Sequence, residues 1–157
     1  MANDTPPTDD QASTLSAQVY ALVNACPTGR VTTYGALAKA IGYPRGARMV
    51  GWIMNDTPHG VPAQRVINSK GELSGSWAFG TPDLMRQLLE NEGITFSEDG
   101  RVDLKRYGWE PLRDLSEAEL QSILNSANDM HYKPTAKLLG LMQTDPASPF
   151  RGTEERN

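Results

Sequence analysis

The sequence predicts an α+β, mainly helical domain that contains a winged helix-turn-helix. Three observations lead to this fold class: an apolar helical face near the N-terminus, two short helices joined by a tight turn, and short extended segments around a polar turn directly after them. Folds of this kind bind nucleic acids but also protein partners. The fold class alone therefore indicates a possible nucleic-acid binder and no more.

The first predicted helix begins at Thr14 and is stopped by Pro27 and Gly29. Its apolar face consists of four side chains at helical spacing: Leu15, Val19, Leu22 and Val23. Residues 1–13 precede this helix and are rich in Pro, Asp and Thr, a composition that predicts a disordered leader.

The helix-turn-helix is predicted between residues 30 and 55. Residues 30–32 form a short strand, and Thr33 can cap a helix that runs through Ala40 and ends at Gly42. After a Tyr-Pro turn, residues 45–55 form the second helix. Two short helices with this connection match the arrangement of DNA-reading helix pairs.

Residues 61–74 predict the wing as a hairpin, with extended segments 65–67 and 72–73 around a polar turn at 68–71. A second hairpin is predicted over 94–104, turning at an Asp-Gly pair.

Between the hairpins, Thr81 and Pro82 are typical of a helix start, and Gly93 closes that helix. Its buried stripe is predicted to consist of Leu84, Met85, Leu88 and Leu89. Ser116 and Glu119 form a capping box for a last helix ending near Asn128.

At 157 residues the chain suits one compact domain, which we place at 14–111, followed by a C-terminal helix and polar tail at 112–157. A single cysteine, Cys26, excludes an internal disulfide and a cysteine-rich zinc site. No apolar run is long enough to span a membrane, and the polar, acidic start lacks the features of a signal peptide. We therefore expect a cytoplasmic protein without membrane partners.

The formal net charge of −4 argues against a DNA binder, but the acidity lies at the ends of the chain. Residues 17–111 carry ten Lys or Arg against nine Asp or Glu, so the central part is nearly neutral. We expect few phosphate contacts, and recognition through a local patch and a pocket.

Three segments carry specific chemistry: 29–35 (GRVTTYG), 47–51 (ARMVG) and 62–71 (PAQRVINSKG). In this order and spacing they resemble the O6-alkylguanine-DNA alkyltransferase family over about residues 15–111. The resemblance implies the C-terminal, DNA-binding fold of that family. In the family, the third segment reads Pro-Cys-His-Arg-Val, where the cysteine accepts the alkyl group and the histidine, with a downstream glutamate, keeps it deprotonated.

This chain has Ala63 at the cysteine position and Gln64 at the histidine position. A methyl group has no lone pair, and an amide cannot take a proton near neutral pH. Glu92 matches the glutamate but has no thiol to activate; without one it can simply be a polar residue that closes a helix. The chain thus resembles the alkyltransferase-like branch, which binds lesions and hands them to nucleotide excision repair. Many members have Trp at the cysteine position.

The resemblance implies roles for residues on the helix-turn-helix. Arg48, preceded by the small Ala47, matches the arginine that enters the duplex in place of the extruded base, although it could be a solvated helix arginine. Tyr34 matches the tyrosine that crowds the phosphate beside the target nucleotide, and could otherwise pack on the helix pair. Arg65 supports the active-site loop in the family and is thought to sense the modified base in the alkyltransferase-like branch; a structural salt bridge is the competing interpretation.

Four further residues are expected to form the walls of a lesion pocket: Trp52, Met54, Val61 and Trp77. Pro62, Ala63 and Ser76 complete the set of residues expected to bind DNA or the lesion. Trp77 lies in the segment that spans the lesion-binding loop of the family, where an aromatic ring can stack on a flipped base. Trp52 and Met54 are more often core residues at such positions. Ala63 leaves space for bulky alkyl groups.

The sequence therefore predicts a non-enzymatic protein, without cofactor or metal, that binds and flips O6-alkylguanine in double-stranded DNA and flags it for nucleotide excision repair proteins. Two alternatives stay open: an enzyme that removes alkyl groups with another nucleophile such as Cys26, and a winged-helix regulator or protein-binding module without lesion specificity. Residues 112–157, with Lys133, Lys137 and an apolar run at 138–142, either pack on the core or dock a repair partner.

Overall fold

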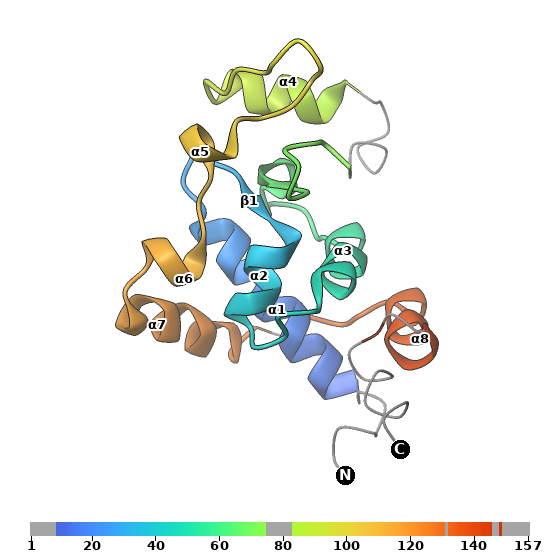
Figure 1. The fold of residues 1–157 in the computed structure, drawn as a ribbon. Coiled ribbons are helices and arrows are strands. Elements are labelled where there is room, and N and C mark those ends of the chain that lie inside the picture. Colours follow the sequence, from blue (N-terminus) through green and yellow to red (C-terminus); the bar gives the residue numbers. More distant parts are fainter. Residues whose placement is uncertain (1–8, 75–82, 131, 146–147, 149–157) are drawn as a thin grey trace.

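The computed structural model describes residues 9–74, 83–130, 132–145 and 148. Most of these residues are helical, and the elements follow one another along the chain (Figure 1). In order they are α1 (Asp9–Ala25), β1 (Thr32–Thr33), α2 (Tyr34–Ala40), α3 (Ala47–Asn55), the 3-10 helix η2 (Ala63–Arg65), β2 (Val66–Ile67), α4 (Leu84–Asn91), α5 (Leu104–Tyr107), α6 (Pro111–Asp114), α7 (Glu117–Ala127) and α8 (Ala136–Thr144). None of the helices in the described ranges is long and apolar enough to cross a membrane.

The first helix, α1, begins earlier than predicted. It starts at Asp9, so residues 9–13 of the predicted leader are helical; residues 1–8 lie outside the described part. Ala12 is fully buried, and Asp9 and Asp10 place negative charge in the first turn, where it interacts favourably with the helix dipole. Burial on the core therefore overrides the polar composition that suggested disorder.

The predicted helix-turn-helix is confirmed in α2 and α3, which pack against each other. Thr33 caps α2 because its hydroxyl Oγ1 accepts a hydrogen bond from the backbone N–H of Ala36 at 3.1 Å. The second helix starts at Ala47, two residues later than predicted. The N–H of Gly46 donates to the carbonyl of Tyr43 at 2.7 Å and closes the connecting turn.

The first predicted hairpin is wrong. β2 pairs with β1 in parallel, in the register Thr32 to Val66, and residues 72–73 form no strand. The predicted turn itself is present, because the N–H of Asn68 donates to the Glu72 carbonyl at 3.2 Å and the Asn68 side-chain oxygen accepts hydrogen bonds from the N–H groups of Lys70 and Glu72 at 3.0 and 2.9 Å. The segment then passes so close to residue 102 that only glycine fits at Gly71, where a Cβ would lie 2.3 Å from a backbone oxygen.

The second hairpin is present as a single antiparallel bridge between Phe96 and Val102, with Gly100 in the turn at φ +79°. Helix α4 begins at Leu84; the predicted start at Thr81 and Pro82 lies outside the described residues. Its predicted apolar stripe is buried in part. Met85 and Leu89 are buried, whereas Leu84 is exposed and Leu88 half-buried.

The buried side chains form two clusters, joined through the β1–β2 pair. The larger cluster gathers α1, α2, α3 and α8, and includes Tyr20, Leu37 and Ile53. The smaller cluster lies under α4 and α5, in the upper part of Figure 1, and includes Ile67 and Leu89. Short ladders between 31 and 107–109 tie the C-terminal half to β1.

The C-terminal segment is folded onto the domain rather than extended from it. The predicted capping box of Ser116 and Glu119 is confirmed in α7, which packs on α1. The expectation that this is the last helix is wrong, because α8 follows and buries Leu138 and Met142 in the larger cluster. Figure 1 shows α7 and α8 on opposite sides of α1. The apolar run at 138–142 therefore packs on the core.

Candidate nucleic-acid interface

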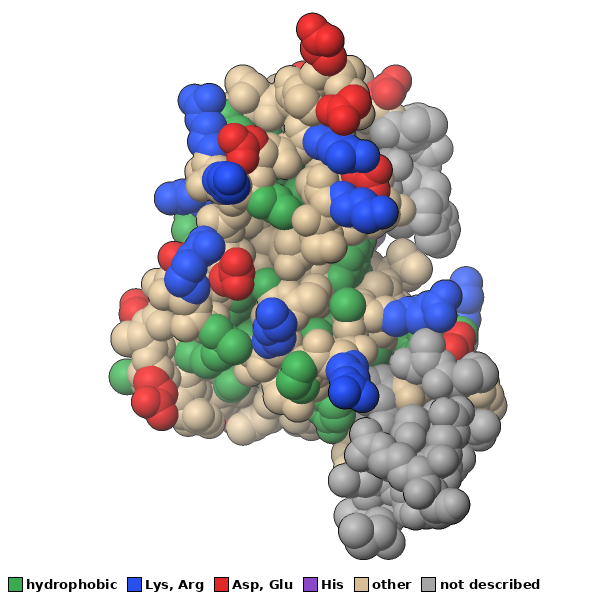
Figure 2. Space-filling view, viewed as in Figure 1, with side chains coloured by type: hydrophobic (Ala, Val, Ile, Leu, Met, Phe, Trp, Pro, Cys, Tyr) green, Lys and Arg blue, Asp and Glu red, His purple; other side chains and the backbone are tan. Residues whose placement is uncertain are grey.

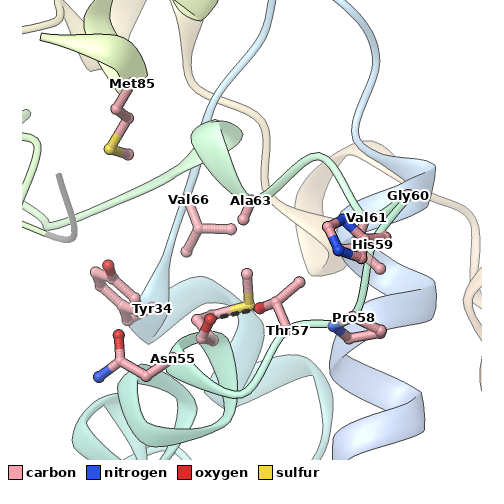
Figure 3. Close-up of a pocket in the computed structure, with 11 residues that line it drawn as sticks. Tyr34, Asn55, Thr57, Pro58, His59, Gly60, Val61, Ala63, Val66 and Met85 are labelled. Atoms are coloured by element: carbon pink, nitrogen blue, oxygen red, sulfur yellow. Dashed lines mark hydrogen bonds between the residues drawn. The ribbon is translucent and has the colours of Figure 1, made fainter. Parts of the chain in front are cut away.

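A pocket of about 310 Å³ opens between α2, the end of α3, η2 and α4 (Figure 3). The loop that follows α3 forms one wall, and Met85 of α4 closes the space from the opposite side. The lining residues are Tyr34, Met54, Asn55, Thr57, Pro58, His59, Gly60, Val61, Ala63, Val66 and Met85. Apolar walls with a few polar groups are typical of a small-molecule or base pocket.

Ala63 opens the 3-10 helix η2 and contributes its methyl group to this pocket. Its backbone N–H donates to the carbonyl of Val61 at 2.8 Å, which curves the chain so that the Val61–Ala63 segment borders the space. The residue at the position predicted for an alkyl acceptor thus faces the pocket. It presents a methyl group, which has no atom able to accept an alkyl group by displacement.

Gln64 and Arg65, the next two residues, point to the carboxylate of Glu92 at the end of α4. The Gln64 amide donates to Oε2 at 2.8 Å, and the Arg65 Nε donates to Oε1 at 3.0 Å. The backbone N–H of Gly29 adds a third donor at 2.9 Å. Because the Gln64 amide cannot accept a proton, this chain of contacts holds the loop but cannot activate a nucleophile.

The groups around Glu92 favour the ionised form of its carboxylate. Burial alone would raise the pKa of Glu92, but the hydrogen bonds from Gly29, Gln64 and Arg65, together with the charge of Arg65, hold this pKa below its usual value. The Glu92 side chain is 10% exposed and that of Arg65 13% exposed. The ion pair is therefore shielded from solvent, and it fixes η2 to the end of α4.

Arg65 also contacts the turn that follows α1. Besides Glu92, its guanidinium donates to the carbonyl of Cys26 at 2.9 Å and to the hydroxyl of Thr28 at 3.0 Å. Arg65 is not among the residues that line the pocket. The structure thus places Arg65 where it joins η2 to Glu92 and to the turn that follows α1.

Tyr34 begins α2 and lies at the pocket, across from Ala63 (Figure 3). Burial raises the pKa of Tyr34, and a hydrogen bond with Ser74 lowers it by a smaller amount. The phenol is therefore neutral at physiological pH. A neutral ring held at the pocket rim can crowd a phosphate without a charge of its own.

Cys26 is separate from the pocket. It is 1% exposed, and burial, opposed in part by the charge of Arg65, raises the pKa of its thiol to about 12. The thiolate is the nucleophilic form of cysteine. This thiol is therefore a poor candidate for a displaced alkyl acceptor.

Helix α3 divides its side chains between the core and the solvent. Met49, Val50, Ile53 and Met54 are buried. On the opposite side, Arg48 and Asn55 are exposed, and Trp52 is half-buried between them. Within the described residues Arg48 takes part in no ion pair. Arg48, Trp52 and Asn55 thus form an outer stripe on α3, with the exposed Arg48 at its N-terminal end.

The pocket brings together four of the residues predicted for it: Tyr34, Met54, Val61 and Ala63. The others lie around it. Ala47, Arg48 and Trp52 lie on α3 outside the pocket, Pro62 and Arg65 flank its η2 wall, and Ser76 and Trp77 lie outside the described residues. No group of three or more potential metal ligands occurs among the described residues.

Sequence reasoning missed the loop at 57–60 and three further lining residues, Asn55, Val66 and Met85. The loop could have been found, because it connects the second helix of the helix-turn-helix to the Pro-Ala-Gln motif and must run along the same rim. Met85 could not have been found in this way, because an apolar residue on the buried stripe of a helix is predicted to be a core residue.

Comparison with known proteins agrees with this geometry. Residues 14–94 match the family described as 6-O-methylguanine DNA methyltransferase, DNA binding domain. A DNA base-flipping protein from Vibrio parahaemolyticus is 43% identical over 96 residues, which are 60% of this chain and 94% of that protein. Alkyltransferase-like protein 1 from Schizosaccharomyces pombe is 35% identical over 101 residues, 60% of this chain and 93% of the relative.

Among solved structures, the chain is similar to S. pombe Atl1 in complex with damaged DNA containing O6-carboxymethylguanine. The two share 33% sequence identity with a TM-score of 0.52, over 62% of this chain and 95% of Atl1. Other relatives are methyltransferases by name, among them a bifunctional methyltransferase/endonuclease from Picrophilus torridus, 38% identical over 69% of this chain and 38% of that protein.

Proposed function

Because this chain belongs to the DNA-binding domain family of the 6-O-methylguanine DNA methyltransferases, as an alkyltransferase-like protein, we propose that it binds O6-alkylated guanine in duplex DNA without removing the alkyl group. One observation carries this proposal. The wall of the pocket where an alkyl acceptor would stand is the methyl group of Ala63, and the neighbouring Gln64 amide is bonded to Glu92.

The pocket holds the extruded base, and the outer stripe of α3 contacts the duplex. The target base leaves the stack, which costs a few kcal/mol, and less when its pairing is already damaged. Tyr34 presses on the adjacent phosphate, and Arg48 fills the space that the base leaves in the duplex. The extruded base enters between Tyr34, Met54 and Ala63, where the small methyl group at position 63 leaves room for the alkyl group.

The test is a binding titration with a duplex that contains one O6-methylguanine and with its undamaged twin, at one salt concentration. We expect a preference of at least about tenfold for the lesion, equivalent to about 1.4 kcal/mol. Indistinguishable curves would contradict lesion recognition and favour a winged-helix regulator without lesion specificity.

The same duplex, labelled in its methyl group, tests the absence of transfer. We expect the label to stay on the DNA after long incubation with excess protein. Label on the protein would support an enzyme that uses another nucleophile, against the high pKa of the Cys26 thiol.

We further propose that the bound lesion is passed to nucleotide excision repair, in line with an intact recognition site that lacks its chemistry. Incision of the O6-methylguanine duplex by a reconstituted excision nuclease should increase when the protein is added. Undamaged duplex is the control, and an unchanged incision rate on the lesion would argue against this transfer.

A further inference from the structure

Helix α8 belongs to the described structure but lies beyond the family match, which ends at residue 94. It packs against α3, the helix whose outer stripe carries Arg48. Leu138 and Met142 anchor it in the larger core cluster. Helix α8 therefore lies beside the C-terminal part of this stripe, at Trp52 and Asn55.

The start of α8 is held at the end of α3 by a set of contacts around Tyr132. The Tyr132 hydroxyl donates to the Asp56 carbonyl at 2.6 Å and also bonds the Asp56 carboxylate. Its ring lies edge-on to Tyr20 at 5.1 Å, and the Tyr20 hydroxyl donates to the Ile53 carbonyl at 2.7 Å. The N–H of Thr135 completes the set by donating to Asp56 at 3.3 Å. The position of α8 relative to α3 is thus fixed by hydrogen bonds as well as by apolar packing.

The two helices share a shallow cleft of about 60 Å³. From α3 it is lined by Trp52 and Asn55, the lower part of the outer stripe, and Asp56 adjoins them. From α8 and its cap it is lined by Thr135, Lys137, Leu138 and Leu141. Two residues of the outer stripe, Trp52 and Asn55, therefore lie at the same cleft as Lys137 of α8.

The charge of this continuation suits an anionic partner. Residues 133–144 contain two lysines and no acid. Lys137 is exposed and takes part in no ion pair within the described ranges. One carboxylate, that of Asp56, lines the cleft with Lys137 and accepts hydrogen bonds from the neutral donors of Tyr132 and Thr135. Figure 2 shows basic side chains at the edge of the molecule where Figure 1 places α3 and α8.

We propose that α8 extends the DNA-binding surface of this protein, with Lys137 contacting a backbone phosphate beside the stretch of duplex that α3 reaches. The inference rests on the proposed function in one respect, that the outer stripe of α3 faces DNA. A Lys–phosphate contact positions the protein on the duplex and carries no sequence or lesion information.

Lys133 provides a matched control on the same segment. It is equally an exposed lysine, but it lines a different groove, together with Asp9, Asp10 and Ser13 at the start of α1. Lys133 therefore lies beside a groove that also contains two carboxylates, and not beside the cleft that α3 and α8 share. Neutralising Lys133 changes the net charge of the protein by the same amount as neutralising Lys137.

The experiment measures binding of wild type, Lys137→Gln and Lys133→Gln to an undamaged duplex of about 20 base pairs, two helical turns, as a function of salt. We expect Lys137→Gln to lower the magnitude of the slope of log K against log salt by about 0.9, the value for one phosphate contact. Its loss of affinity relative to wild type should accordingly be about threefold greater at about 50 mM than at about 200 mM salt. Lys133→Gln should keep the wild-type slope.

Two results would overturn the proposal: a Lys137→Gln slope equal to that of wild type, or equal losses in both variants, which would show a net-charge effect. Melting temperatures of both variants equal to that of wild type establish that folding is unchanged. Because the duplex is undamaged, the outcome does not depend on lesion preference. A wild-type protein that ignores O6-methylguanine would end the proposed function but leave this comparison valid.

Discussion

At the scale of single residues, the loss of alkyl transfer is explained by two adjacent positions, Ala63 and Gln64. We expect Ala63→Cys alone to react slowly with O6-methylguanine, because an ordinary thiol with a pKa near ~8.5 is only a few per cent thiolate at neutral pH. Ala63→Cys with Gln64→His should react faster, since the Gln64 side chain already lies 2.8 Å from Glu92 and an imidazole there could use the same carboxylate.

Single-turnover transfer of a labelled methyl group from DNA to protein measures both variants. The single variant Gln64→His is the control and should take up no label. A fully active Ala63→Cys would show that the scaffold activates a thiol without the histidine.

Glu92 gives the second prediction at this scale. Glu92→Gln should destabilise the fold by about 1–3 kcal/mol near neutral pH, because it weakens hydrogen bonds to a charged acceptor and leaves Arg65 without its counter-charge. The pKa of Glu92 is lowered in the folded state, so its contribution is present above the ordinary value of 4.5 and disappears as pH falls through the lowered folded-state pKa.

The difference in melting temperature between wild type and Glu92→Gln should therefore be largest near pH 7 and shrink below about pH 4.5. Thermal unfolding followed by circular dichroism across this range measures it. Glu90→Gln, which removes an exposed partner of Arg86, should behave like wild type throughout. A gap that stays constant down to the lowest pH would show that ionisation of Glu92 contributes nothing.

At the scale of residues, the sequence was enough to predict that the alkyl acceptor and its base are absent. It was not enough to predict which groups the Arg65 side chain contacts. The substitutions at 63 and 64 are visible in the chain itself. The partners of Arg65, by contrast, come from two distant segments, the turn with Cys26 and Thr28 and the end of α4 with Glu92, and nothing local to Arg65 indicates that they meet.

At the scale of elements, α2 and α3 should contribute separately to binding. Arg48→Ala should weaken lesion binding and reduce the fluorescence of an extruded-base reporter, while the melting temperature stays unchanged because this side chain is exposed. Wild-type binding and extrusion by this variant would make Arg48 a solvated surface charge.

Tyr34→Phe should be milder than Tyr34→Ala in the same reporter assay. The ring packs against the larger core cluster and lines the pocket, so bulk at this position matters more than the hydroxyl group. Equal losses from the two substitutions would contradict this steric account.

The attachment of α8 gives a further prediction at this scale. Tyr132→Phe removes the hydroxyl that bonds Asp56 but keeps the ring beside Tyr20. We expect a loss of about 0.5–1.5 kcal/mol, since one hydrogen bond contributes about that much, and about 2–4 °C in melting temperature for each kcal/mol. Tyr132→Leu should cost more, because it also removes the edge-on ring contact. An unchanged melting temperature in both variants would show that this attachment is unimportant.

Elements defined by local chemistry were predictable, and elements defined by distant partners were not. Thr33 and Ser116 cap their helices as expected because the interaction spans three residues. The β1–β2 pair was mistaken for half of a hairpin, since two residues of strand carry no information about which segment they join. The sequence indicated only an apolar run at the position of α8, because the residues against which this helix packs are far away in the chain.

At the scale of the whole molecule, the net charge of −4 should appear in the salt dependence of binding. Only a local set of cations can reach phosphates, so we expect a slope of log K against log salt of magnitude roughly 2–4, against roughly 5–9 for proteins with six to ten phosphate contacts. Titrations with the lesion duplex between about 50 and about 200 mM salt measure it. A steeper slope would show that the acidic ends leave a broad positive field intact.

The burial of Cys26 makes the protein unusually simple to label. It is the chain's one cysteine, and its thiol is both 1% exposed and raised in pKa to about 12, so maleimide reagents should leave the folded protein unmodified. A cysteine introduced at an exposed position of α3, such as Asn55→Cys, would then be a unique dye attachment site without removal of the native thiol. Conversely, slow modification of Cys26 itself would report how often the end of α1 opens.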